Sequence, residues 1–396
     1  MFRGAAGAVL GIMTHLTRTT GWPAVLVVAT GIFTVVTSEM LPVGLLTPMG
    51  AALQVSEGTA GQTLTTTGIV AAVAAPLVVP ALGRIDRRTA LVALTALLAA
   101  ANLLAAWAPA FAVMVVARVL VGVAMGGIWA LSAGLAVRLV APGAVGRATA
   151  TIFSGIAVAS VLGVPAGTFL GAIAGWRAAF VVVGALSAAV ALAMVVLLPR
   201  LPAERAPGLS GVTALLRNPP VATGLVVVAL LVVGHFGAYT YVRPVLEGLA
   251  IDAPLIGTLL LVYGVAGVLG NFVAGTAAVR SVPRTMQVLA GLVVAAVLLL
   301  ALAPSASLAA VALVVWGLGY GGVSVTAQTW MMAAAPEARE TVSSLFAAVF
   351  NGAIALGAVG GGLVVDGFGP SAVLVWGAVL AAAALVAVAT GRAPRS

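Results

Sequence analysis

The feature that most constrains this chain is a series of apolar blocks, each about 20 residues long, separated by short breaks rich in proline, glycine or arginine. A helix needs about 20 apolar residues to cross the hydrocarbon core of a bilayer. These blocks are apolar on every side, whereas the strands of a transmembrane barrel alternate apolar and polar residues. The sequence therefore predicts an all-α polytopic membrane protein with spans at 23–48, 59–81, 89–108, 110–136, 146–170, 177–198, 221–244, 254–278, 286–303, 307–332, 340–364 and 370–391.

The composition excludes several classes of function. Only 7% of the residues are charged, and soluble domains contain about a quarter. The net charge of +9 comes from single arginines scattered between apolar blocks, so we expect no nucleic-acid partner. There is no cysteine, and the two histidines, His15 and His235, are far apart, so we expect neither a disulfide nor a metal site.

The arginines also predict the topology. If residues 1–22 form a cytoplasmic leader, 15 of the 18 arginines lie on the cytoplasmic side of the membrane. Such an excess is typical of cytoplasmic loops. A signal peptide is the alternative reading of the leader. We therefore expect an integral plasma-membrane protein with both termini in the cytoplasm.

The longest polar break, residues 199–220, forms a predicted cytoplasmic loop that divides the chain into two halves of six spans, 23–198 and 221–391, followed by a tail at 392–396. Shifting the sequence by 194 positions aligns several glycine and Ala-Pro positions of the two halves, which indicates a duplicated unit. An even number of spans per unit makes the halves parallel, with substrate held between them. The aligned pairs are Gly127 with Gly321, Ala141-Pro142 with Ala335-Pro336, Gly163 with Gly357, Gly167 with Gly361, and Gly175 with Gly369.

Two ionisable residues lie inside predicted spans. Glu39 in the first span and Arg118 in the fourth each lie about eight residues from the outer end, roughly 12 Å deep. Ionisable groups at such depth are costly and mark functional paths by default. We interpret Glu39 as a proton carrier whose proton affinity Arg118 modulates. The alternatives are a static buried ion pair, or an Arg118 satisfied by backbone carbonyls.

The seventh span contains a candidate ligand-binding face. His235 and Tyr239 are four residues apart and therefore lie on one side of a helix, where they suit a polar ligand. Packing is the alternative role. Further polar or aromatic residues that line the cavity or join helices in this prediction are Trp129, Asn271, Trp316, Gln328 and Asn351.

The fifth span carries small residues around a proline, at Gly163, Pro165 and Gly167. Small residues let membrane helices approach closely. We expect this run to form a sliding contact between the halves.

A charged cluster follows the second span, at Arg84, Asp86, Arg87 and Arg88. It could hold a cytoplasmic gate closed through charge pairs, or it could serve only as a topology anchor. The chain has no P-loop, so we expect transport to use an ion gradient rather than ATP.

Several motifs make the whole chain resemble the major facilitator superfamily, and within it the proton-coupled efflux permeases of drugs, sugars and nucleosides. One departure is Gly83, which stands where the superfamily's loop motif has an aspartate, with Asp86 where a glycine is usual. The similar motifs are Thr37-Ser38-Glu39-Met40-Leu41-Pro42-Val43-Gly44-Leu45-Leu46, Arg118-Val119-Leu120-Val121-Gly122 with Gly126, Gly163-Val164-Pro165-Ala166-Gly167 with Gly171, Gly234-His235-Phe236 with Tyr239, Tyr241 and Pro244, Gly270-Asn271 with Gly275, and Phe350-Asn351-Gly352.

The resemblance implies a fold of twelve helices in two halves related by pseudo-two-fold symmetry. It implies a proton-coupled antiporter of a bacterium that exports a small organic solute by alternating access. A chloramphenicol-type multidrug exporter and an uncoupled facilitative carrier are the alternatives. We expect a monomer whose partners are a small-molecule substrate, protons and lipid, with no cofactor and no enzymatic activity.

Overall fold

The computed structural model describes residues 2–132, 135–202 and 215–394. This part of the chain is almost entirely helical. In the first half the helices are α1 (Phe2–Leu53), α2 (Glu57–Leu82), α3 (Arg87–Ala106), α4 (Phe111–Ser132), α5 (Ala136–Leu139), η1 (Pro142–Ala144), α6 (Val145–Ala174) and α7 (Trp176–Leu197). In the second half they are α9 (Pro219–Thr240), α10 (Val242–Gly248), α11 (Ala253–Arg280), α12 (Val282–Ala301), α13 (Ala306–Gly321), α14 (Val323–Ala334), η2 (Pro336–Ala338), α15 (Arg339–Phe368) and α16 (Pro370–Thr390).

The helices occupy the predicted spans. Within the described residues, 11 helical stretches are long and apolar enough to cross a membrane. α2 occupies the remaining predicted span, 59–81, beside α4 and α15. α1 continues without interruption from the predicted leader into the first span, although it contains Pro23, Pro42 and Pro48. Most of the predicted central loop, residues 203–214, lies outside the described residues.

Each half repeats one packing pattern. In the first half α1 packs on α6, α2 on α4, and α3 on α7. In the second half α9 packs on α15, α11 on α13, and α12 on α16, so equivalent members of each set of six are paired. The offset of 194 also relates η1 to η2, and it relates Gly175 to Gly369, which have positive φ values of 81° and 88° at equivalent turns.

Apolar side chains occupy both the inside and the outside of the bundle. One buried apolar cluster fills the second half and another fills most of the first. The outer surface also carries large exposed apolar residues, among them Ile173, Val279 and Phe368, each more than 80% exposed. A surface of this kind is stable in lipid and not in water.

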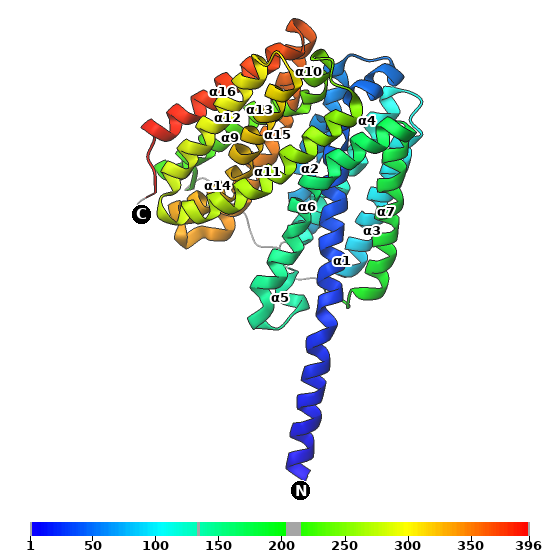
Figure 1. Cartoon of the computed structure of the whole chain (residues 1–396). Coiled ribbons are helices and arrows are strands. Elements are labelled where there is room, and N and C mark those ends of the chain that lie inside the picture. Colours follow the sequence, from blue (N-terminus) through cyan, green and yellow to red (C-terminus); the bar gives the residue numbers. More distant parts are fainter. Residues whose placement is uncertain (1, 133–134, 203–214, 395–396) are drawn as a thin grey trace.

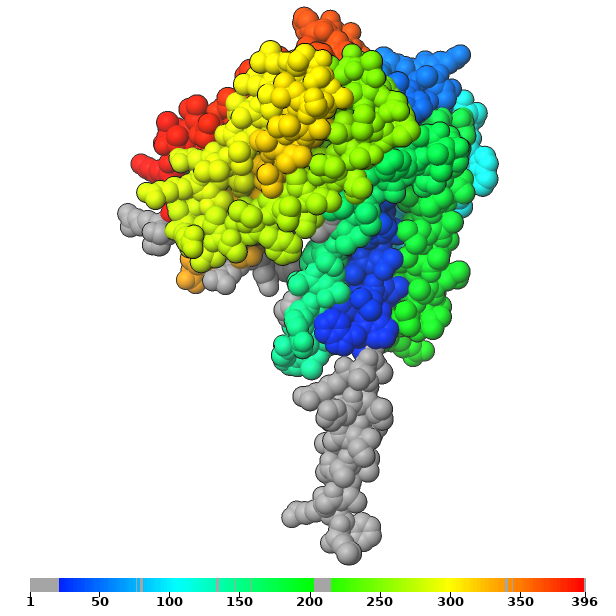
Figure 2. Space-filling view, in the orientation of Figure 1, coloured from blue at the N-terminus to red at the C-terminus, as the bar shows by residue number. Residues whose placement is uncertain are grey.

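The halves meet at one end of the bundle, near α10, and spread apart toward α5 and α14 (Figure 1). The contacts between them run from α2 to α15, from α6 to α11 and from α1 to α10. In the space-filling view the halves form one continuous surface at this end (Figure 2). We call it the closed end; it carries Thr47, Glu57, Glu247 and Asp366.

The predicted sliding contact between the halves is wrong in one respect. The glycines of α6 pack on α1, which belongs to the same half: a Cβ at Gly163 would lie 3.0 Å from Thr37, and one at Gly167 would lie 2.3 Å from Leu41. The contact of α6 with the other half is made elsewhere, by Ser160 against Gly264 of α11. The small residues around Pro165 therefore build the first half rather than its boundary.

Candidate functional site

Arg118 of α4 is fully buried and points at the backbone of two neighbouring helices. Its Nη1 donates to the carbonyl of Ser38 at 2.9 Å, its Nη2 donates to the carbonyl of Glu39 at 3.1 Å, and its Nε donates to the carbonyl of Thr63 at 3.2 Å. Arg118 and Glu39 therefore lie at the same depth, as predicted. The guanidinium joins α1 and α2 through carbonyl groups.

Glu39 is 5% exposed and interacts electrostatically with Arg118. The printed hydrogen bonds of Arg118 go to backbone oxygens rather than to the Glu39 carboxylate. The guanidinium thus supplies a fixed positive potential while the carboxyl keeps its own oxygens for other partners. Its neighbour Ser38 is anchored separately, by a hydrogen bond of 2.9 Å to the buried Asn102 of α3.

Five aromatic side chains from three helices of the second half form what we call the aromatic cluster. Its centre is His235, whose Nδ1 accepts a hydrogen bond of 3.0 Å from the indole of Trp316. The His235 ring stacks on Tyr239 with 5.2 Å between centroids, so the predicted shared face of α9 is present. The members are His235 and Tyr239 from α9, Tyr263 from α11, and Trp316 and Tyr320 from α13.

The aromatic cluster adjoins the other half through Glu39. Tyr320, which stacks on His235, has a hydroxyl on which the Glu39 carboxyl acts electrostatically. Met40, next to Glu39, packs against the buried apolar clusters of both halves. The predicted proton carrier and the predicted ligand face are therefore neighbours across the junction of the halves.

Other predicted binding residues lie apart from the aromatic cluster. Trp129 stacks on Phe153 within the first half, at 6.0 Å between centroids. Gln328 donates to Ser343 at 2.8 Å and joins α14 to α15. The Asn351 amide donates to the carbonyl of Ala347, one turn earlier on its own helix. Asn271 lies on α11, two turns beyond Tyr263.

The charged cluster after α2 contacts its own half. Asp86 caps α3 by accepting from the amide of Arg88 at 2.9 Å, and it also accepts from the amide of Leu201 at 2.8 Å. The guanidinium of Arg88 donates to the carbonyl of Val195, and Arg84 is exposed. These contacts tie the turn between α2 and α3 to the end of α7, which suits an anchor. The predicted gate remains a prediction.

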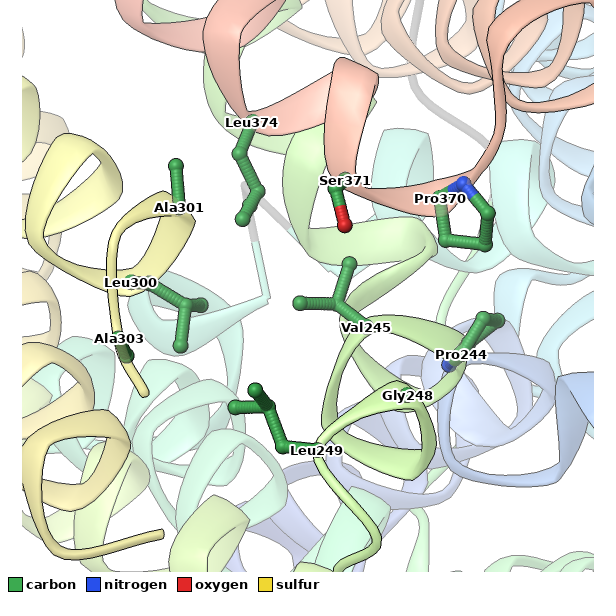
Figure 3. A pocket seen from close by; sticks show the side chains of 10 residues that line it. All are labelled: Pro244, Val245, Gly248, Leu249, Leu300, Ala301, Ala303, Pro370, Ser371 and Leu374. Carbon is green, nitrogen blue, oxygen red and sulfur yellow. The ribbon is translucent and has the colours of Figure 1, made fainter. Parts of the chain in front are cut away.

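A pocket at the closed end lies within the second half, between α10, α12 and α16 (Figure 3). Its lining is apolar apart from the hydroxyl of Ser371. It contains no charged side chain and no member of the aromatic cluster, so it offers little to a polar solute.

The closed end is held by polar contacts between the halves. Arg243 of α10 donates to the carbonyl of Gly44 and pairs with Glu247 at 2.8 Å. Asp366 of α15 accepts from the hydroxyl of Ser56 at 2.8 Å and from the amide of Gly58 at 3.0 Å. The sequence analysis singled out none of the carboxylates at this end.

Thr47 of α1 links two of those carboxylates. Its hydroxyl lies 2.6 Å from Glu247 and 3.3 Å from Glu57. A hydroxyl has one hydrogen to donate, so both contacts are satisfied when one of the two carboxyls is protonated. Burial raises the pKa of Glu57, the hydrogen bond from Thr47 opposes this increase, and the charges of Glu247 and Asp366 add to it.

We therefore expect the thermal stability of the protein to fall as the pH rises through the raised pKa of Glu57. The folded state binds this proton more tightly than the unfolded state does, so folding is favoured at the acidic side of that window. Glu57→Gln is neutral at every pH, and its melting temperature in detergent should depend less on pH than that of the unsubstituted protein. Glu337→Gln, at an exposed position, is the control. Equal pH dependence in all three proteins would contradict this expectation.

Two members of the aromatic cluster were missed by the sequence analysis, Tyr263 and Tyr320. The signal that could have found them is rarity, because the chain has only four tyrosines, all in the second half. Three of these four lie around His235. The fourth, Tyr241, donates to the carbonyl of Ala358 at 2.8 Å near the closed end.

Comparison with known proteins places this architecture. The sequence profile of the Major Facilitator Superfamily matches residues 27–358. The purine ribonucleoside efflux pump NepI of Salmonella paratyphi B is 34% identical over 353 residues, which is 88% of each chain. The pump of the same name from Salmonella enteritidis has the same identity and coverage.

Solved structures agree on the fold. The nucleoside transporter NupG superposes with a TM-score of 0.77 at 16% identity, over 93% of this chain and 98% of that one. A bacterial homolog of the human lysosomal transporter Spinster, in an inward-facing and occupied conformation, has a TM-score of 0.73 at 16% identity, over 92% of this chain and 95% of that one. Because the profile spans most of the sequence and the curated relatives share a third of it, the protein belongs to the major facilitator superfamily of membrane transporters.

Proposed function

We propose that this protein exports purine ribonucleosides across a bacterial plasma membrane in exchange for protons, as its two halves open alternately to either side. One observation carries the proposal: the buried Glu39 lies at the junction of the halves and acts on Tyr320, a member of the aromatic cluster. A proton on Glu39 and a solute at the aromatic cluster can therefore influence each other directly.

The substrate class follows from the chemistry of the cluster. Apolar aromatic faces with a few polar groups suit a planar ring that also carries hydrogen-bonding atoms. The base of a nucleoside has both properties, and stacking of a base on an aromatic side chain contributes about 1–3 kcal/mol. The identity of the curated relatives, purine ribonucleoside efflux pumps, supports the same class.

The direction of opening follows from the arginines. The ends of α2, α7 and α11 and the starts of α3 and α9 carry Arg84, Arg87, Arg200, Arg217 and Arg280 or lie next to them, all opposite the closed end. Basic residues favour the cytoplasmic side. The end at which the halves spread apart therefore faces the cytoplasm in this proposal, and the closed end faces outward.

Transport in proteoliposomes tests the proposal. An outwardly or inwardly directed pH gradient should drive accumulation of radiolabelled guanosine, and guanosine flux should move protons, read with a pH-sensitive dye in the lumen. Guanosine flux that ignores the gradient would indicate the uncoupled carrier. Flux of chloramphenicol without flux of guanosine would indicate the multidrug exporter.

His235→Phe should weaken guanosine binding about tenfold, because phenylalanine keeps an aromatic ring but has neither ring nitrogen. A tenfold change corresponds to about 1.4 kcal/mol, close to the net contribution of one hydrogen bond. Equilibrium binding of radiolabelled guanosine to purified protein measures the effect. His15→Phe, at the other histidine of the chain, is the matched control and should bind as the unsubstituted protein does.

A further inference from the structure

Tyr320 and His235 are stacked more closely than any other pair in the aromatic cluster. Their centroids are 3.2 Å apart and their planes differ by 6°. The other stacked pairs have centroids 4.8 to 6.5 Å apart. Aromatic pairs prefer offset or edge-to-face arrangements, with centroids about 4.5–7 Å apart, over a face-to-face sandwich. Tyr320 therefore occupies the least favourable ring arrangement of the group.

The hydroxyl of Tyr320 is buried and has no hydrogen-bond partner among the described residues. Leaving a buried polar group unpaired costs about 1–3 kcal/mol. Trp316, by contrast, is anchored to His235 by its indole hydrogen bond. Neither ring geometry nor a hydrogen bond thus holds Tyr320 in its place.

The backbone at Tyr320 is interrupted. The residue lies in the run Gly319-Tyr320-Gly321-Gly322, where α13 ends and α14 begins. The amide of Gly322 donates to the carbonyl of Tyr320, two residues earlier, so the helical hydrogen-bond pattern stops at this point. Discontinuous membrane helices of transporters commonly form substrate sites, and such a break lets the Tyr320 side chain change position without bending a whole helix.

His235 offers the other half of a recognition site. Its Nδ1 accepts from Trp316, so the neutral ring carries its proton on Nε2. No described residue accepts a hydrogen bond from that group. The face and the edge of His235 can therefore serve a planar ring that carries an acceptor atom, and guanine presents two, O6 and N7.

We propose that Tyr320 is a displaceable ring: it stacks on the face of His235 that the planar base of the substrate takes, and substrate binding moves it aside at the break between α13 and α14. This inference rests on the proposed function for the identity of the substrate. It assigns Tyr320 a role opposite to that of the fixed cluster members, because its ring competes with the base instead of supporting it.

Competition predicts the sign of a mutational effect. Binding that must first displace a ring is weakened by the fraction of molecules in which the ring is in place. Tyr320→Ala should therefore bind radiolabelled guanosine more tightly, with a Kd on the order of threefold to tenfold lower. Tyr263→Ala, which removes a fixed member of the cluster, should raise the Kd. Tyr320→Phe keeps the ring and should stay within about twofold of the unsubstituted protein.

Two further measurements keep the test decisive. Tyr320→Leu fills most of the volume without an aromatic face, and it should shift the Kd in the same direction as Tyr320→Ala if the latter is poorly folded. D-ribose has no planar ring, and neither Tyr320 variant should bind it better. A higher Kd for guanosine in Tyr320→Ala and Tyr320→Leu would overturn the displacement, as would improved ribose binding. No guanosine binding by the unsubstituted protein would overturn the proposed function, and with it the ligand assigned to this site.

Discussion

Glu39→Gln should reduce pH-gradient-driven guanosine transport in proteoliposomes to the level of liposomes without protein. Glutamine has nearly the same shape as protonated glutamate but cannot release a proton, so the carrier has nothing to exchange. The position is buried and belongs to the junction of the halves. Guanosine binding should be retained, because the aromatic cluster is contributed by the second half alone.

Two controls make this result specific to coupling. Glu337→Gln makes the same chemical change at an exposed position and should transport normally. Exchange of labelled for unlabelled guanosine in the absence of a gradient should persist in Glu39→Gln if the substrate site is intact. Gradient-driven transport by Glu39→Gln at the unsubstituted rate would remove the assignment of Glu39 as proton carrier.

Arg118→Met should both destabilise the protein and abolish transport. The guanidinium is the donor for three buried carbonyl groups on α1 and α2, and a hydrogen bond to a charged group contributes about 1.5–3 kcal/mol. Loss of a buried charge that has a charged neighbour adds to this cost. We expect the free energy of unfolding to fall by about 3 kcal/mol or more, seen as a lower melting temperature in detergent.

Arg118→Lys separates the charge from the hydrogen bonds. Lysine keeps the positive potential beside Glu39, but a single ammonium group cannot span three carbonyls as a planar guanidinium does. It should melt between Arg118→Met and the unsubstituted protein. Arg284→Met, at an exposed position on α12, controls for the loss of one arginine. An unchanged melting temperature for Arg118→Met would show that the three carbonyl contacts contribute nothing to stability.

The residues at the junction explain how much of the site the sequence could predict. Glu39, Arg118 and His235 stand out because ionisable groups are rare in apolar spans, and the structure places all three at or beside the boundary of the halves. Residues whose type is ordinary in a membrane helix carry no such signal. Trp129 and Trp316 look alike in the sequence, yet one packs on Phe153 and the other bonds to His235.

The closed end shows the same limit for charged residues. Glu57, Glu247 and Asp366 lie near the ends of helices, where charge is common and predicts only exposure to water. Their proximity to Thr47 and Gly58 joins residues up to 308 positions apart. No local pattern encodes a contact of that kind, because it depends on how the two halves are docked.

The sequence by itself determined that this chain is a bundle of membrane helices with a repeated half, because a bilayer requires about 20 apolar residues per span and the offset of 194 is written in its glycines and prolines. Only the tertiary structure decided which helix faces meet: that the glycines of α6 belong to α1, that Arg118 serves carbonyls, and that Tyr320 covers His235. The physical reason is that helices apolar all around have no face that their sequence marks as inner, so packing and close approach between helices select it.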